Sequence, residues 1–197
     1  MVAKEIAFTI RFHTPFRVGA AYAEDGLDAV VDRDDPLPAD HLKGLMRAEA
    51  TKLLKGTSGE HLVRDVFGSV EAPAAWAWTS AAPSGAWSSP TQRHRVKIDK
   101  ASHTATRHHL VMTNVVFVDS ATFTVEKMNP SITAAKHESL IRLSGRLVQH
   151  LGAWRRRGLG WVQVGVADDP LDPEALRGVI RREFAELPRN SLGSGVA

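Results

Sequence analysis

The stretch EDGLDAVVDRDDPLPADHLKGLMR, residues 24–47, decides how the rest of the chain is interpreted. It begins with an acid-rich segment, passes through the turn Pro36-Leu37-Pro38, and ends in a predicted helix with Lys43 and Arg47 one turn apart. Carboxylates that can do chemistry therefore lie a few residues before cations that can hold an anion. The carboxylates belong to Asp25, Asp28, Asp32, Asp34 and Asp35.

The composition allows one large domain or two small ones in 197 residues, and a hydrophobic fraction of 43% is enough for a core. The absence of cysteine excludes disulfides, thiolate metal ligands and a cysteine nucleophile, and it fits a reducing cytoplasm. The net charge of +3 alone is too small to indicate nucleic-acid binding. The distribution is more informative, because acids cluster at 24–35 and 168–174, and bases at 93–109 and 155–157.

The N-terminal residues MVAKEIAFTIRF alternate and lack the unbroken apolar core of a signal peptide. No apolar run approaches the length of a transmembrane helix. We therefore expect a cytoplasmic location and no membrane partner.

Two segments near the N-terminus have clear periodicities. Residues 4–13 predict a half-buried strand, and residues 41–54 predict a helix with Asp40 as its N-cap. Gly44 lies inside this helix, where it costs up to about 1 kcal/mol relative to alanine. We expect very close packing there or the approach of another backbone. The strand residues predicted to share the apolar face are Ile6, Phe8, Ile10 and Phe12.

The remaining order of elements suits a ferredoxin-like α+β sheet with helices on one face. Residues 71–92 leave two readings open, either strands joined by turns or a partly mobile excursion. The other expected elements are a helix at 60–67, a strand around Val96 and Ile98 with a projecting turn at 100–104, one or two strands within 110–126, a helix at 134–151, a strand at 161–166, a helix starting at Asp172, and a loose tail at 188–197.

The glycine-bounded loop from Gly152 to Gly160 is the sharpest motif. Glycines let a backbone approach a phosphate closely, and Arg155, Arg156 and Arg157 add charge that can pair with phosphate. The competing interpretation is a helix C-cap at Gly152 followed by a solvated basic turn. The loop is not a P-loop, because no Gly-Lys-Ser/Thr follows.

The other candidates are weaker. Lys43 and Arg47 fit an anion site, but an exposed helix face carries such pairs commonly. The aspartates can bind Mg²⁺ or Ca²⁺, although the full EF-hand pattern is missing. His94, His103, His108 and His109 fit a basic hairpin touching nucleic acid better than a zinc finger. His13 and His41 can serve acid–base chemistry. Of the tryptophans, we expect Trp161 to be core and Trp154 to be exposed.

Several motifs, in order, resemble the RAMP superfamily, and most of all the Csm- or Cmr-type backbone subunit of type III CRISPR effector complexes. The match spans residues 4–166. Arg-Val-Lys-Ile-Asp at 95–99 is similar to the start of the family's inserted thumb hairpin. The other motifs are the Gly turn Phe16-Arg-Val-Gly19, the loop from Leu27 to Asp34, the helix start from Leu37 to Arg47, and the loop from Gly152 to Gly160 followed by Trp161-Val162.

The resemblance implies a single RRM-like domain over residues 1–187, with the thumb inserted at about 71–112 and a flexible tail at 188–197. It implies binding to guide RNA (crRNA) and target RNA, stacking with other copies of itself, and assembly with other CRISPR effector subunits. It also implies endoribonuclease activity on target RNA. Asp28 would be the catalytic residue and the ligand of Mg²⁺ or another divalent cation, helping a 2′-hydroxyl attack the adjacent phosphate. The implied RNA-binding residues are Lys43, Arg47, Arg95, Lys97, Gly152, Arg155, Arg156, Arg157, Gly158 and Gly160.

The sequence departs from the family at Asp40 and His41, where members often have small residues, commonly serine, and its Gly-rich turn is reduced to Gly19. Two alternatives stay open. The chain can hold RNA without cutting it, or it can be a standalone endoribonuclease that processes guide precursors with His13 or His41 as base.

Overall fold

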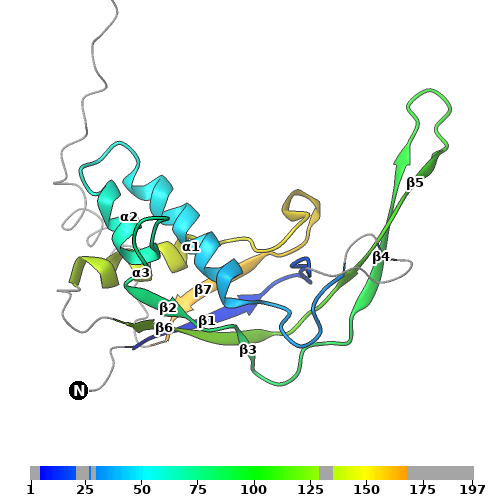
Figure 1. Ribbon diagram of the computed structural model, residues 1–197. Helices are drawn as coiled ribbons and strands as arrows, with labels where there is room; N and C mark the ends of the chain where they lie inside the picture. Colours follow the sequence, from blue (N-terminus) through cyan, green and yellow to red (C-terminus); the bar gives the residue numbers. More distant parts are fainter. Residues whose placement is uncertain (1–4, 21–26, 28–29, 129–134, 168–197) are drawn as a thin grey trace, which may run out of the picture.

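The structure is a computed structural model, and it describes residues 5–20, 27, 30–128 and 135–167. Its centre is an antiparallel sheet in the order β2-β6-β1-β7, with β3 also pairing with β6 (Figure 1). Asp28, the predicted helix from Asp172 and the predicted tail at 188–197 lie outside the described residues. The sheet strands are β1 (Glu5–Phe12), β2 (Trp76–Trp78), β3 (Ala82–Pro83), β6 (Ser120–Lys127) and β7 (Val162–Val166).

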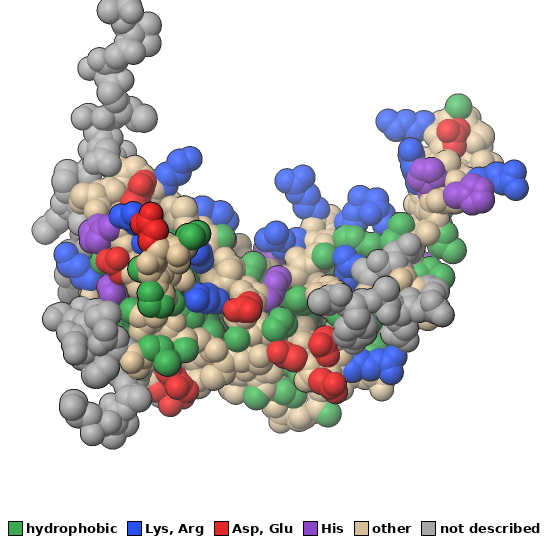
Figure 2. All heavy atoms as spheres, in the orientation of Figure 1, with side chains coloured by type: hydrophobic (Ala, Val, Ile, Leu, Met, Phe, Trp, Pro, Cys, Tyr) green, Lys and Arg blue, Asp and Glu red, His purple; other side chains and the backbone are tan. Residues whose placement is uncertain are grey.

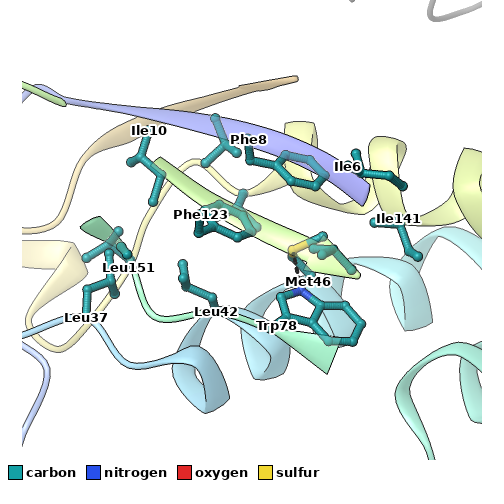
Figure 3. Close-up of a cluster of buried hydrophobic side chains, with 14 of the residues drawn as sticks. Ile6, Phe8, Ile10, Leu37, Leu42, Met46, Trp78, Phe123, Ile141 and Leu151 are labelled. Carbon is teal, nitrogen blue, oxygen red and sulfur yellow. Dashed lines mark hydrogen bonds between the residues drawn. The ribbon is translucent and has the colours of Figure 1, made fainter. Parts of the chain in front are cut away.

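The alternation predicted for the first strand is confirmed. Ile6, Phe8, Ile10 and Phe12 of β1 are all buried, and Phe8 stacks on Phe123 of β6 with ring centroids 4.8 Å apart. Figure 3 shows Ile6, Phe8, Ile10 and Phe123 among the buried side chains between the sheet and the helices. Gly145 of helix α3 lies so near that a Cβ there would overlap the Phe8 ring, so α3 packs directly on the sheet.

Three helices cover one face of the sheet: α1 (Ala39–Leu54), α2 (Glu60–Phe67) and α3 (Ala135–Leu147). This arrangement confirms the predicted ferredoxin-like α+β fold. Helix α3 ends four residues earlier than predicted, although Leu151 beyond it is still buried. In the described part of the chain, no helix combines the length and apolar character needed to cross a membrane.

The start of α1 differs from the prediction at Asp40. The helix begins at Ala39, with Pro38 in the extended N-cap position and without a side-chain hydrogen bond from a cap residue. Ser80 supplies part of the N-terminal capping, because its Oγ accepts a hydrogen bond from the Ala39 N–H (3.2 Å). The same hydroxyl donates a hydrogen bond to Asp35 (2.7 Å). Asp40 instead lies exposed in the first turn, where a negative charge suits the helix dipole.

The segment expected at 71–112 contributes to two parts of the molecule. Its strands β2 and β3 pair with β6 in the main sheet, whereas β4 (Thr91–Ile98) pairs with β5 (Ala105–Val115) in a separate hairpin. The hairpin projects from the body (Figure 1). Asp99 organises its predicted turn by accepting hydrogen bonds from the backbone N–H groups of Ala101 and Ser102.

Candidate nucleic-acid interface

Helix α1, the glycine loop (residues 152–160) and the hairpin β4–β5 surround the concave upper surface of the molecule (Figure 1). Figure 2 shows Lys and Arg side chains rising from this surface, while most of the acidic side chains in that view lie beneath it or over the helical end, with one more at the tip of the hairpin. A surface of this kind attracts a polyanion.

The glycine loop is clamped to the segment that follows β1. The Ala153 N–H donates to the Arg17 carbonyl (2.8 Å), and the Gly160 N–H donates to the Pro15 carbonyl (2.8 Å). Gly152 and Gly160 have positive φ angles, and a Cβ would overlap the carbonyls of Arg17 and Leu151 respectively. These two glycines are therefore required by the chain's own backbone. Gly158, also at positive φ, has no atom of the described chain near its Cβ position.

Arg155, Arg156 and Arg157 form a short 3₁₀ turn, η1, and all three are exposed. The turn lies between Trp154 and Gly158, which both have left-handed backbone conformations. The competing interpretation of this motif is wrong in its first part, a helix C-cap at Gly152, because α3 ends at Leu147. Its second part, a basic turn exposed to solvent, agrees with the structure. The loop presents three guanidinium groups to solvent from a rigidly anchored base.

Trp154 connects the glycine loop to the hairpin. The guanidinium carbons of Arg17 and Arg95 lie 5.0 and 5.8 Å from its ring centroid, within the range of cation–π attraction. Arg17 also donates from Nη1 to the Thr113 hydroxyl of β5 (2.9 Å). We call Arg17, Trp154, Arg95 and Thr113 the tryptophan bracket. Trp154 is thus half-buried rather than exposed, and Trp161, expected in the core, is 52% exposed.

A cavity of about 410 Å³ opens beside the tryptophan bracket, at the base of the hairpin. Its lining includes the cations of Arg93, Arg95 and Arg157 and the imidazole of His94. Lys97 lies further along β4 and is exposed. The hairpin histidines His94, His103, His108 and His109 are exposed as well, which leaves them open to contact from a ligand.

Helix α1 meets the glycine loop through His41, not through its predicted anion-binding residues. The Gly152 N–H donates to His41 Nε2 (3.0 Å). Burial lowers the pKa of His41, and the nearby positive charge of Arg155 lowers it further. Residues two apart lie about 200° apart around a helix, so Lys43 is on the opposite flank, with its ammonium 5.6 Å from the Trp78 ring centroid. Arg47 is exposed.

Gly44 lies on the exposed face of α1, between the two flanks. Apart from Gly44's own neighbours in the helix, no described atom comes within 4 Å of its Cβ position, so no described residue packs closely there. The approach of another backbone, the other expectation for Gly44, remains a prediction.

The acid-rich segment is described only in part. Asp32 accepts hydrogen bonds from the N–H groups of Asp34 and Asp35 (2.9 and 3.3 Å), and Asp35 accepts one from Ser80. Asp32 therefore organises its own loop, and Asp35 ties that loop to Ser80. Among the described residues, no group of three or more His, Asp or Glu side chains is placed to hold a metal ion. Asp28 is not among those residues.

Sequence reasoning missed Arg17 and Thr113 and placed His41 only as a candidate base. Arg17 was within reach, since it lies in the Phe16-Arg-Val-Gly19 turn that was already singled out. Thr113 carries no such signal, because its partner Arg17 is 96 residues away in the chain.

Comparison with protein-family models identifies one family, and comparison with solved structures finds chains of similar fold. The model of the RAMP superfamily matches residues 9–163. A chain of the type III-B Cmr-beta complex in its apo state is similar in structure, with a TM-score of 0.65 and 12% identity over 84% of this chain and 98% of that one. A chain of Cmr-beta bound to cognate target RNA gives a TM-score of 0.62 and 13% identity, covering 90% and 99%. The search of curated proteins finds no match.

Proposed function

Since the chain belongs to the RAMP superfamily, we propose that it is a guide-RNA-binding backbone subunit of a type III CRISPR ribonucleoprotein that positions and cleaves complementary target RNA in antiviral defence. The observation that carries this proposal is the concave basic surface between α1, the glycine loop and the hairpin. Its cations come from three elements far apart in the sequence, so the fold has gathered them.

The proposed RNA path runs along this concave surface and not over the outer face of the sheet. Sheet-binding RRM domains stack bases on aromatic side chains of their strands. Here the outward positions of β1 are Glu5, Ala7, Thr9 and Arg11, and Glu5 faces Glu126 of β6. Paired carboxylates repel phosphate, and these outward positions of β1 carry no aromatic side chain on which a base could stack.

The individual roles follow from exposure. Arg155, Arg156 and Arg157 would contact phosphates, because they are exposed on an anchored turn. Lys43 and Arg47 would hold the RNA backbone where it crosses Gly44. Lys97 would contact RNA from the hairpin. Arg95 is half-buried against Trp154, so its role would combine RNA contact with positioning of the hairpin.

Target cleavage would depend on Asp28, which would also hold the divalent cation. When bound, the cation would supply positive charge beside the scissile phosphate. The Asp28 carboxylate would help a 2′-hydroxyl attack that phosphate, a reaction closed to DNA. His41 is a poor candidate for the base of a standalone nuclease, because its Nε2 already accepts the Gly152 N–H.

The first experiment is to purify the protein with its partners from its native host and to sequence the RNA that accompanies it. Short RNAs of uniform length with a repeat-derived end are the expected result. A folded protein that carries no RNA would contradict the proposed guide-bound assembly. The isolated chain should leave guide precursor intact, whereas cleavage would favour the standalone nuclease.

The second experiment tests catalysis with Asp28→Ala in the assembled complex. We expect target cleavage to be lost while guide RNA stays bound, because the substitution removes the proposed catalytic carboxylate and no phosphate-binding cation. Asp34→Ala is the matched control, since Asp34 is an exposed acid of the same segment. Unchanged cleavage in the Asp28 variant would leave a subunit that holds RNA without cutting it.

A further inference from the structure

His41 joins α1 to the glycine loop through an acceptor that a proton can remove. The Gly152 N–H points at His41 Nε2 at 3.0 Å in a partly buried position. An imidazole nitrogen accepts a hydrogen bond only when it carries no hydrogen, so the ring must be neutral with its proton on Nδ1. Protonation would put a second N–H against that of Gly152.

The other anchors of the loop differ from this one in kind and direction. The hydrogen bonds from Ala153 and Gly160 to the carbonyls of Arg17 and Pro15 are backbone contacts that do not titrate, and they hold the loop to the segment after β1. The His41 contact instead reaches across to the helix that carries Lys43 and Arg47. The glycine loop and α1, which both carry cations, are therefore joined by a hydrogen bond that depends on the protonation of His41.

We propose that neutral His41 is a positioning residue that sets the glycine loop against α1, so that the cations of both elements face one RNA backbone. This proposal rests on the proposed RNA-binding function. It assigns a role to a residue at which the sequence departs from the family pattern. His41 itself need not touch RNA, because it acts through the Gly152 N–H.

The surroundings of His41 favour its neutral form. It is partly buried, and Arg155 brings positive charge from the loop side. On its own helix its neighbours include the exposed Asp40 and Lys43, which lies on the opposite flank. Acidification should therefore weaken RNA binding through His41. Other groups of the protein that gain protons over the same pH range also change the attraction for RNA, so the test compares variants that share those groups.

A pair of variants separates these effects. In His41→Gln the amide oxygen can accept the Gly152 N–H and does not titrate, whereas His41→Leu removes the acceptor. The affinity of the full purified chain for a fluorescein-labelled single-stranded RNA is measured by anisotropy at fixed ionic strength, from about pH 8 to about pH 5. At neutral pH the Gln variant should bind like the wild type, and the Leu variant about three- to tenfold more weakly.

The decisive quantity is the ratio of wild-type affinity to Gln-variant affinity as the pH falls. It should decline, because only the wild type loses its acceptor, while every other titratable group is common to both proteins. A constant ratio, or a folded Leu variant that binds like the wild type, would overturn the proposal.

A second readout keeps this test separate from the proposed function. Amide hydrogen exchange at Gly152, followed by NMR, should show protection in the wild type that is lost on acidification and retained in the Gln variant. If the wild-type chain binds no RNA, the proposed function fails. If protection of the Gly152 amide were the same at every pH and in every variant, this result alone would overturn the positioning role of His41, whether or not the chain binds RNA.

Discussion

At the scale of single residues, the glycines of the basic surface fall into two groups. Gly152 and Gly160 are held by the chain's own carbonyls, whereas the Cβ position of Gly44 is open. Gly44→Ala should therefore stabilise α1 by up to about 1 kcal/mol, because alanine is the better helix former. The same methyl group should weaken RNA binding if a phosphate backbone crosses the helix there. Urea unfolding and RNA titration measure the two effects.

The diagnostic outcome for Gly44→Ala is a gain in stability together with a loss of RNA affinity. Gly160→Ala is the contrasting variant, because a Cβ there would overlap Leu151 and should lower stability outright. If Gly44→Ala raised stability and left RNA affinity unchanged, nothing would approach this face of α1, and the proposed RNA path would have to avoid it.

His137 gives a second prediction at this scale. It is buried in α3, its Nδ1 lies 3.4 Å from the Trp76 indole nitrogen, and burial lowers its pKa. Below the ordinary pKa near 6.5 the unfolded chain binds the proton that the folded chain resists, so stability should be full above that pH and fall as the pH drops. Urea unfolding at about pH 7.5 and about pH 5.5 measures the loss.

Replacing the buried imidazole should flatten this pH dependence. His137→Gln should narrow the difference in unfolding free energy between the two pH values, while His103→Gln, exposed at the hairpin turn, serves as the matched control. The change at His41 has the same sign, so some pH dependence should persist in the His137 variant. If the pH dependence of the unfolding free energy were the same in His137→Gln as in the wild type, His137 would not be a source of that dependence.

At the scale of elements, the tryptophan bracket determines how the hairpin is held. Trp154→Ala removes two cation–π contacts worth about 0.5–1 kcal/mol each. Amide exchange in β4 and β5 near Arg95 and Thr113 should speed up several-fold, and it should recover in Trp154→Phe, which keeps an aromatic face. Trp161→Ala, an exposed tryptophan outside the bracket, should leave hairpin exchange unchanged. Equal exchange in all three variants would contradict the bracket.

Elements with local periodicity were predictable, and their mutual placement was not. The alternation from Ile6 to Phe12 sets the buried face of β1 within a single strand. The start of α1 was misjudged because Ser80, 41 residues from Ala39, takes over capping there. The orientation of the hairpin relative to the sheet depends on Arg17, Trp154 and Thr113, which come together only in the folded chain. The loop was recognised as basic, but the need for Gly152 came from the Arg17 carbonyl, which no sequence pattern displays.

At the scale of the whole molecule, the net charge of +3 conceals an uneven distribution, because in Figure 2 several Lys and Arg side chains line the concave surface while many acidic side chains lie beneath it. If RNA lies on that surface, each phosphate neutralised releases counterions, and log affinity falls with log salt by about 0.7 per contact for a single strand. Arg156→Ala should therefore weaken binding at low salt and reduce the slope by about 0.7. Anisotropy titrations of a single-stranded RNA across a salt series measure both quantities.

Arg64→Ala is the matched control for this whole-molecule prediction, because Arg64 is equally exposed but lies on α2 at the helical end. It makes the same change in net charge. Generic attraction between RNA and a basic protein would make the two variants lose affinity alike, with similar slopes. A defined path along the concave surface requires that Arg156 changes the slope and Arg64 does not, because counterion release counts phosphates in contact and not the total charge of the protein.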